Sequence, residues 1–194
     1  MGNRGFYLDI QSCIGCRTCQ VACKDRNRLE AGLNFREVRS YETGAFPTPA
    51  LWHYSAACNH CEAPACVANC PTGSMQKALD DGTVQHEDAL CIGCGTCVKT
   101  CPYQVPVLLP DRGNIAGKCD ACKPFRDAGK NPVCVDACIM RCLDFGDTEE
   151  LRARYGPDLT NALPVLASPD TTHPNTLIKP KKAALEAVSR EVSI

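Results

Sequence analysis

The stretch Cys13-Ile14-Gly15-Cys16-Arg17-Thr18-Cys19, with Cys23 four residues further on, decides how this chain folds. Its spacing, C-x2-C-x2-C-x3-C, returns in Cys91-Ile92-Gly93-Cys94-Gly95-Thr96-Cys97 and Cys101, where only the fifth letter of the heptapeptide changes. Two further groups share the closing C-x3-C: Cys58, Cys61, Cys66 and Cys70, then Cys119, Cys122, Cys134 and Cys138. In chain order these are groups one to four. Of the 17 cysteines in 194 residues, only Cys142 stands outside them.

The composition excludes several classes of protein. A formal net charge of -1, from 21 Lys and Arg against 22 Asp and Glu, argues against a nucleic-acid binder, which shows a basic excess. The longest apolar stretches, such as Val105–Leu109, are far shorter than the roughly 18 residues that cross a bilayer, so we expect no direct membrane span. The first residues show no twin arginine and no apolar signal core, so we expect no export signal. Without such a signal, an odd cysteine count points to metal ligation rather than disulfides.

The spacing indicates which metal is bound. C-x2-C-x2-C-x3-C is the bacterial ferredoxin pattern, in which three cysteines hold one iron–sulfur cluster and the fourth ligates the other cluster of a pair. In every group the last two cysteines are four residues apart, which on a helix puts them on one face roughly 5–6 Å from each other. Group four, C-x2-C-x11-C-x3-C, resembles a zinc site when it is considered alone. Groups one and three crowd three cysteines into seven residues, which is typical of iron–sulfur proteins and a poor match to zinc.

The order of the groups predicts two modules. Groups two and three flank Asp81-Gly82, a hairpin signal between Ser74–Leu79 and Thr83–His86. They form one contiguous ferredoxin-like module, residues 50–104. Groups one and four must then pair across it, which gives an outer module of residues 1–49 plus 105–148. We therefore expect an α+β fold of two nested ferredoxin-like modules, each with two [4Fe–4S] clusters, built from short strands and helices.

Other elements follow from local patterns. Strands are expected at Phe6–Ile10, Phe35–Tyr41, Leu51–Ala56 and Cys142–Phe145, and Asp147 is placed to cap a helix over Thr148–Tyr155. Five prolines between 156 and 180 leave little room for regular structure, so this segment is either a linker or an arm that packs on a partner. Lys181–Glu191 is expected to be a short helix. Residues 149–194 would thus form a C-terminal helix and an extended partner-binding arm.

Several stretches carry a resemblance that goes beyond the cysteines. These are Ser12-Cys13-Ile14-Gly15-Cys16, Cys58-Asn59-His60-Cys61-Glu62-Ala63-Pro64-Ala65-Cys66, Leu143-Asp144-Phe145-Gly146, Pro174-Asn175 and Ile178-Lys179-Pro180. With the four spacings in this order, the protein resembles the iron–sulfur subunit, the B subunit, of the anaerobic dimethyl sulfoxide reductase family. The resemblance implies a subunit that relays single electrons between a quinol-oxidising membrane anchor, or another donor, and a molybdenum–pterin catalytic subunit.

The resemblance also implies which cysteines share a cluster. Site 1 is Cys13, Cys16, Cys19 and Cys138; site 2 is Cys119, Cys122, Cys134 and Cys23; site 3 is Cys58, Cys61, Cys66 and Cys101; site 4 is Cys91, Cys94, Cys97 and Cys70. Nitrate-reductase relatives replace the second cysteine of group three and carry a three-iron cluster, whereas Cys94 is kept here, so four [4Fe–4S] clusters are expected. Sixteen thiolates around four cores of about +2 add roughly -8 to the protein's charge. The complex would be peripheral to a membrane, exported with its catalytic partner or otherwise cytoplasmic.

Some residues permit two interpretations. Cys142 is either a small buried residue at the start of a strand or an alternative ligand or redox thiol. His60 suggests a ligand of a Rieske-like centre, but its quartet is complete without it, so we expect it beside a cluster or at the surface. Arg17, Lys24 and Lys99 adjoin ligands and either raise nearby potentials or are solvated. No Gly-rich phosphate loop or Ser/His/Asp arrangement is found, so catalysis is assigned to another subunit. The alternative function is a freestanding polyferredoxin that serves soluble redox enzymes.

Overall fold

The computed structural model describes residues 2–193 as a mixed α/β structure of short elements. The strands are β1 (Arg4–Asp9), β2 (Glu37–Thr43), β3 (Ala50–Ala56), β4 (Met75–Lys77), β5 (Val84–His86), β6 (Val107–Leu109), β7 (Ile115–Gly117), β8 (Leu143–Asp147), β9 (Leu177–Lys179) and β10 (Ser189–Val192). The α-helices are α1 (Thr18–Asn27), α2 (Ala65–Ala68), α3 (Thr96–Thr100), α4 (Lys123–Asp127), α5 (Val133–Asp136) and α6 (Thr148–Tyr155). Single 3-10 turns are η1 (Asp88–Leu90), η2 (Pro110–Arg112), η3 (Pro169–Thr171) and η4 (Lys182–Leu185).

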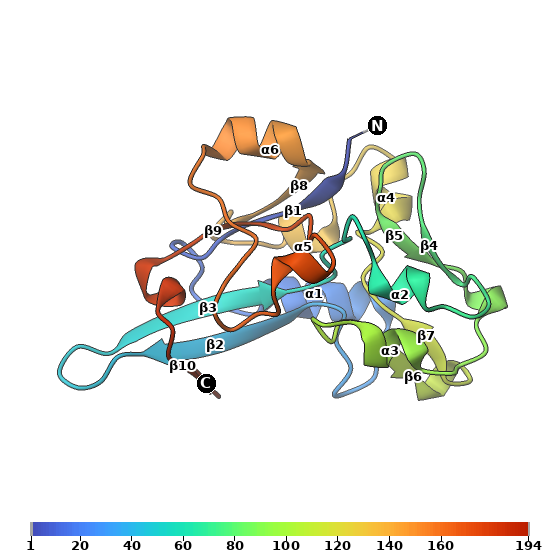
Figure 1. The fold of residues 1–194 in the computed structure, drawn as a ribbon, viewed down its shortest axis with the longest axis horizontal. Coiled ribbons are helices and arrows are strands. Elements are labelled where there is room, and N and C mark those ends of the chain that lie inside the picture. Colours follow the sequence, from blue (N-terminus) through green and yellow to red (C-terminus); the bar gives the residue numbers. More distant parts are fainter. Residues whose placement is uncertain (1, 194) are drawn as a thin grey trace.

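The elements gather in two parts. Figure 1 shows α2, α3 and the small hairpins β4–β5 and β6–β7 on one side, with the two larger sheets on the other. The first of these sheets has the order β8-β1-β9, in which β1 is antiparallel to β8 and parallel to β9. The second has the order β10-β2-β3 and is antiparallel throughout. The four predicted strands are confirmed as β1, β2, β3 and β8, with ends shifted by one or two residues.

The first sheet is buried on both faces. Phe6, Leu8 and Ile178 face the main core, while Tyr7 and Leu177 pack under α6. The predicted helix α6 is confirmed, because the Asp147 carboxylate accepts hydrogen bonds from the backbone N–H groups of Glu149 and Glu150 and so caps its first turn. The ring of Tyr155 at the end of α6 stacks on Tyr7 at 3.7 Å between centroids. This sheet therefore forms a rigid wall beside the cysteine groups.

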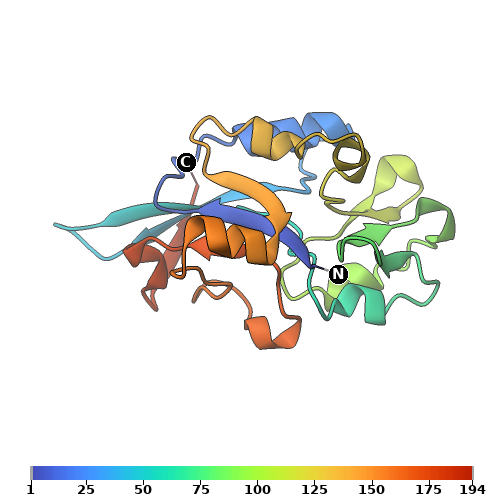
Figure 2. The same ribbon diagram turned by 90° about the horizontal axis from the view of Figure 1, so that it is seen from above.

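The helices that carry the cysteines pack in two pairs. α1 lies against α5, and α2 lies against α3. Figure 2 shows α1 beside the segment that holds α4 and α5, on the opposite side of the β1 sheet from α6. The predicted hairpin around Asp81-Gly82 is confirmed as β4–β5. None of the helices within residues 2–193 has the length and apolar character needed to cross a bilayer.

The C-terminal segment differs from the expectation in two ways. The predicted helix over Lys181–Glu191 is wrong: only the turn η4 forms, and Ser189–Val192 is strand β10. The unpaired N–H and C=O groups along the edge of β2 bind this segment, and such pairing outweighs a weak helix propensity. The linker interpretation of residues 156–180 is also wrong, because Leu163, Leu177 and Ile178 are buried in the protein's own core.

Candidate metal centres

Three of the four predicted quartets each line one cavity. One cavity is lined by the cysteines of site 1, a second by those of site 3 and a third by those of site 4. In each cavity three sulfur atoms come from one group and the fourth from another: Cys138 joins group one, Cys101 joins group two and Cys70 joins group three. The structure therefore brings together the side chains that the resemblance assigns to sites 1, 3 and 4.

The cysteines of site 2 are all buried between α1 and α5. Burial, together with the neighbouring thiols of Cys134 and Cys122, raises the pKa of Cys23 to about 12 against the opposing charge of Arg36. Cys119 lies beside Cys23 on one side and beside Cys58 of group two on the other, and burial raises its pKa as well. Site 2 is thus the place where the outer cysteine groups approach the inner ones.

The spacing predicts that one turn of helix carries the closing cysteines of each group, and among the described helices only α1 does so. α1 holds both Cys19 and Cys23, which face the core while the rest of the helix is solvated. α2 and α5 begin directly after Pro64 and Pro132, whose fixed φ favours extended backbone before a first helical turn. These two helices have only four residues each and end before the last cysteine of their group. Cys70, Cys101 and Cys138 therefore lie just beyond the helices of their groups.

The loops around the sulfur atoms supply hydrogen-bond donors. Backbone N–H groups of Met75, Ala116 and Ala121 donate to the sulfur atoms of Cys70, Cys91 and Cys119 at 3.3–3.5 Å. The two repeated loops use the same side chain: Thr18 Oγ1 lies 3.4 Å from Cys16 Sγ, and Thr96 Oγ1 lies 3.3 Å from Cys94 Sγ. Donors of this kind stabilise thiolates and help to set the potential of an iron–sulfur cluster.

The two repeated loops also pack closely against other segments at their third residue, Gly15 or Gly93, where no side chain would fit. A Cβ atom at Gly15 would lie 2.6 Å from the ring of His53, and one at Gly93 would lie 2.8 Å from the carbonyl oxygen of Asn114. Four thiols that line one cavity, with hydrogen-bond donors to their sulfur atoms, fit the ligand set of a [4Fe–4S] cluster. Within the described residues, 2–193, no three Cys, His, Asp or Glu side chains converge closely enough for a single metal ion. The zinc alternative for group four gains no support from this geometry.

Burial makes most of these thiols hard to ionise. It raises the pKa of Cys61 to about 11 and that of Cys66 to about 12, because a thiolate loses its hydration inside the protein. Iron ligation requires the thiolate form, so the charge of a bound cluster must offset this cost. Loading the sites therefore releases protons and contributes directly to folding.

Two of the four sites, site 1 and site 4, each have one exposed cysteine. Cys16 of site 1 and Cys94 of site 4 are the two exposed cysteines among residues 2–193, and they occupy equivalent places in the repeated loop. The isoleucine two residues before each is also exposed, Ile14 by 54% and Ile92 by 68%. Site 2 is buried.

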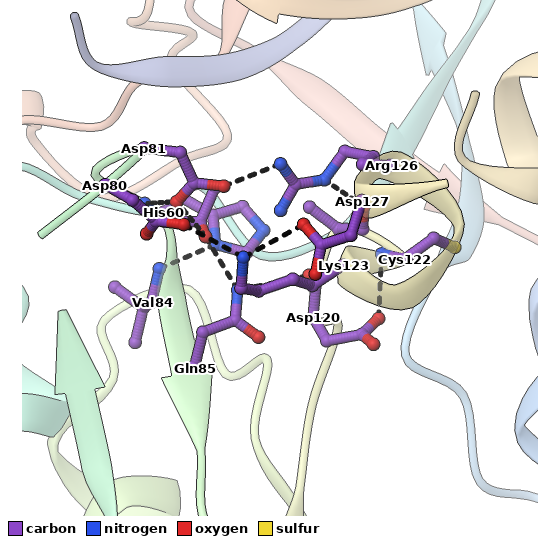
Figure 3. A network of polar contacts seen from close by, with 12 residues as sticks. His60, Asp80, Asp81, Val84, Gln85, Asp120, Cys122, Lys123, Arg126 and Asp127 are labelled. Carbon is purple, nitrogen blue, oxygen red and sulfur yellow. Dashed lines mark hydrogen bonds and ion pairs between the residues drawn. The ribbon is translucent and has the colours of Figure 1, made fainter. Parts of the chain in front are cut away.

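His60 lies beside the cysteine sites, so the alternative prediction that it is a surface residue is wrong. Its side chain is fully buried, and its Nδ1 accepts a hydrogen bond from the backbone N–H of Val84 at 3.0 Å (Figure 3). The proton is therefore on Nε2, which points at Cys119 Sγ at 4.0 Å. Burial, together with the charges of Lys118 and Arg126, holds the pKa of His60 well below its usual value. The neutral ring connects the loop of group two with a cysteine of group four.

A polar network joins the two parts of the molecule at this point. Arg126 of α4 donates to the Asp81 carboxylate at 2.6 Å, and both side chains are buried (Figure 3). Burial alone would raise the pKa of Asp81, but hydrogen bonds from Thr83 and Arg126 outweigh it and lower the pKa to about 2. The neighbouring pair Lys123–Asp80 spans the same junction at the surface. Asp81 therefore anchors the β4–β5 hairpin onto α4.

Two buried cations escaped the sequence analysis. Lys118 is buried beside site 3, where its Nζ donates to the carbonyl oxygens of Cys119 and Val84. Arg36 is buried between the strands of the second sheet and the cysteine groups. The sequence gives one indication that Lys118 lies near a cysteine site, since it directly precedes Cys119. It gives none for Arg36, which is twelve or more residues from any cysteine of the quartets.

The basic residues that adjoin ligands in the sequence have other roles. Lys24 donates to the backbone carbonyls of Glu30 and Leu33 and so closes the loop after α1. Arg17 has a left-handed backbone at the start of α1, and Lys99 is exposed on α3. Within residues 2–193 none of these three side chains donates a hydrogen bond to a sulfur atom, but Arg17 lines the cavity of site 1.

Cys142 is buried at the start of β8, as expected of a small core residue, but it also lines the cavity of site 1. Its sulfur lies 3.4 Å from Cys138 Sγ. A hydrogen bond from Cys142 lowers the pKa of Cys13, and the same contact raises the pKa of Cys142. Cys142 is thus a protonated thiol that supports two cysteines of the quartet.

Comparison with known proteins agrees with this chemistry. The profile of the 4Fe–4S dicluster domain matches residues 50–148, and that of the 4Fe–4S binding domain matches residues 10–27. The B subunit of anaerobic dimethyl sulfoxide reductase from Haemophilus influenzae is 41% identical over 193 residues, which cover 95% of this chain and 92% of that protein. The protein of the same name from Escherichia coli strain K12 is 41% identical over 184 residues, covering 91% and 88%. Protein NrfC of Escherichia coli K12 is 36% identical over 148 residues, covering 75% and 66%.

Proposed function

This protein belongs to the family of the B subunit of anaerobic dimethyl sulfoxide reductase, the iron–sulfur electron-transfer subunit, and from this premise we propose that it relays single electrons through four [4Fe–4S] clusters. The donor is a quinol-oxidising membrane anchor or another reductant, and the acceptor is a molybdenum–pterin catalytic subunit. The two ferredoxin-like modules are nested, because groups two and three form the inner module and groups one and four form the outer module.

The ligand sets of the proposal are the four sites defined above. They are supported by the three cavities in which three cysteines of one group meet the last cysteine of its partner group. The burial of Cys23, Cys119, Cys122 and Cys134 beside one another supports the remaining set. This exchange of the fourth ligand is the observation that carries the proposal, because it is what makes two clusters neighbours.

A bound [4Fe–4S] cluster takes up and returns one electron without making or breaking a covalent bond. The protein's own residues provide everything else. The packed pairs α1–α5 and α2–α3 bring cysteines of different groups together, and the apolar core around Cys23, Cys119 and Cys134 excludes water from site 2. Thr18, Thr96 and backbone N–H groups donate to the sulfur atoms and hold the ligands in their ionised form.

Two surfaces are available for the two partners. One surrounds site 1 and exposes Ile14, Ile139 and Met140, and the other surrounds site 4 and exposes Leu90 and Ile92. Each lies next to the exposed cysteine of its site. The complex is peripheral to the membrane, where it is exported with its catalytic partner or stays on the cytoplasmic side.

Anaerobic purification of the full-length protein tests the metal content of the proposal. We expect about sixteen iron atoms per molecule, a broad visible absorbance that dithionite bleaches, and electron paramagnetic resonance signals of several interacting clusters. A colourless or zinc-loaded protein would contradict the proposal.

Affinity purification from cells that express the whole operon tests the partner. We expect a stoichiometric molybdenum-containing subunit to be retained with the tagged protein. A stable soluble monomer with four clusters and no molybdenum partner would instead support the freestanding polyferredoxin.

A further inference from the structure

Arg36 is a buried cation without an anionic side chain to balance it. Its side chain is 98% buried, and within residues 2–193 no carboxylate lies within ion-pair distance of it. Burying an unpaired guanidinium is costly, and such groups normally have an anionic partner. An anion of another kind is therefore expected next to Arg36.

The hydrogen bonds of Arg36 satisfy only part of the guanidinium. Nη1 donates to the carbonyl oxygen and the hydroxyl of Ser55, at 3.0 and 2.9 Å. Nε and Nη2 are buried and have no partner in the described part of the molecule. The ring of Phe6 packs against the guanidinium at 4.4 Å and holds it in place. Two donors of a fixed, charged group thus remain available.

The surroundings of these free donors are sulfur atoms. Burial acts to lower the pKa of Arg36, but the nearby sulfur atoms of Cys134, Cys19, Cys119 and Cys23, when ionised, outweigh it and raise the pKa. Cys19 belongs to site 1, and the other three belong to site 2. Arg36 therefore lies between the two sites of the outer module.

Ser55 extends the reach of Arg36 to a ligand. The Ser55 hydroxyl accepts from Arg36 Nη1, so its own hydrogen is free to donate to Cys19 Sγ, 3.3 Å away. Arg36 thereby fixes the rotamer of Ser55 and the direction of its O–H bond. One side chain acts on site 1 through Ser55 and on site 2 by direct proximity.

We propose that Arg36 is the positioning and charge-balancing residue of sites 1 and 2, which raises the reduction potentials of both clusters. This inference rests on the proposed function. A [4Fe–4S] core with four thiolates carries a charge of about -2, and one electron from the donor makes it about -3 with no proton or bond exchanged. A fixed positive charge nearby favours the more negative state. Sites 3 and 4 have no contact with Arg36 and are unaffected by it.

The test is a redox titration of the purified, cluster-loaded protein with dithionite and mediators, followed by electron paramagnetic resonance. In Arg36→Met we expect the ratio of reduced to oxidised cluster, measured at a fixed potential, to fall about tenfold at two of the four clusters. For a one-electron step this equals a decrease of roughly 59 mV in the reduction potential. Arg36→Lys keeps the charge and should restore most of the shift. Arg39→Met removes an equal charge from the Glu37 ion pair at the surface of β2 and should leave all four potentials unchanged.

A second variant keeps the proposal testable if Arg36→Met does not fold. Ser55→Ala removes the hydroxyl beside Cys19 and should lower the potential of one cluster alone, by less than Arg36→Met lowers it. The proposal is overturned if folded Arg36→Met keeps the native reduction potentials and shows only a lower denaturation midpoint, because Arg36 would then be a packing residue. If Arg36→Met does not fold, the same result in Ser55→Ala overturns it. A native protein with no reducible cluster would refute the proposed function itself, which is a separate result.

Discussion

The outer and inner cysteine groups differ in how deeply they bury their sulfur atoms. Six of the eight cysteines in groups one and four are buried, against three of the eight in groups two and three. The outer groups pack on the two larger sheets, whereas the inner groups, apart from Cys58, pack on the two-stranded hairpins β4–β5 and β6–β7. The outer cysteines are thus held in a large apolar core and most of the inner ones in a smaller one.

The largest effect should follow removal of iron. We expect the apoprotein to lose most of its helical circular dichroism, because ligation free energy is folding free energy in such a domain. The comparison predicts an order: amide protection in β4 and β5 should vanish, while β1 and β8 retain part of theirs because their pairing is backed by an apolar core. Hydrogen exchange of the native and apo forms measures this. An unchanged circular dichroism spectrum would contradict the expectation.

Single ligand losses should affect the two halves unequally. Cys134→Ser removes a ligand that is 97% buried in the outer half, and we expect loss of both outer clusters and an aggregated product. Cys94→Ser removes an exposed ligand of site 4, where water can replace the thiolate. We expect this variant to fold, to keep three clusters and to convert the fourth to a three-iron form. Iron content and electron paramagnetic resonance of the oxidised proteins distinguish these outcomes, and equal damage in both would contradict the comparison.

The junction between the halves provides a matched pair of substitutions. Asp81→Asn leaves Arg126 buried without a charged partner and should lower the unfolding free energy by about 3 kcal/mol. Asp80→Asn at the neighbouring position breaks an exposed pair, whose carboxylate is 63% exposed, and should leave the denaturation midpoint unchanged. Urea titration of both variants against the native protein gives the difference.

The pKa of Asp81 adds a pH test to the same pair. Because the folded pKa, about 2, is below its ordinary 3.8, the stabilising contribution is fully present above about pH 4 and is lost as the pH falls through 2. The difference between native protein and Asp81→Asn should therefore be constant from about pH 5 to pH 8. A difference that declines within this range would show that another group titrates at the junction.

The smallest effect concerns the one position at which the repeated loops differ. Arg17 and Gly95 precede α1 and α3, and both have a left-handed backbone, with φ of 62° and 71°. Only glycine adopts this conformation without a steric cost. Arg17→Gly should stabilise the outer half slightly, and Gly95→Ala should destabilise the inner half by about 1 kcal/mol. The nearest atom to a new Cβ at Gly95 is at 3.8 Å, so contact strain does not contribute. Thermal denaturation under anaerobic conditions measures both.

Much of the local structure was predictable because it depends on short-range patterns. The hairpin at Asp81-Gly82 and the helix capped by Asp147 require only neighbouring residues, and both are present. The C-terminal helix was predicted wrongly, because the edge of β2 is distant in the sequence and no local pattern of residues 181–191 reports its presence. The sequence left two positions open for the His60 side chain, beside a cluster or at the surface. Only its contacts with Val84 and Cys119 in the folded protein distinguish them.

The sequence by itself determined the kind of metal group and the number of cysteine quartets, since cysteine spacing within one loop sets which sulfur atoms can reach one cluster. It also pointed to the exchange of the fourth cysteine, because in the C-x2-C-x2-C-x3-C pattern the fourth cysteine ligates the other cluster of a pair. The tertiary structure alone decided which sites are buried and which charges lie beside them. Arg36, Ser55 and Cys19 come from three separate segments, and their contact exists because β2, β3 and α1 pack together, an outcome of long-range contacts that no local pattern encodes.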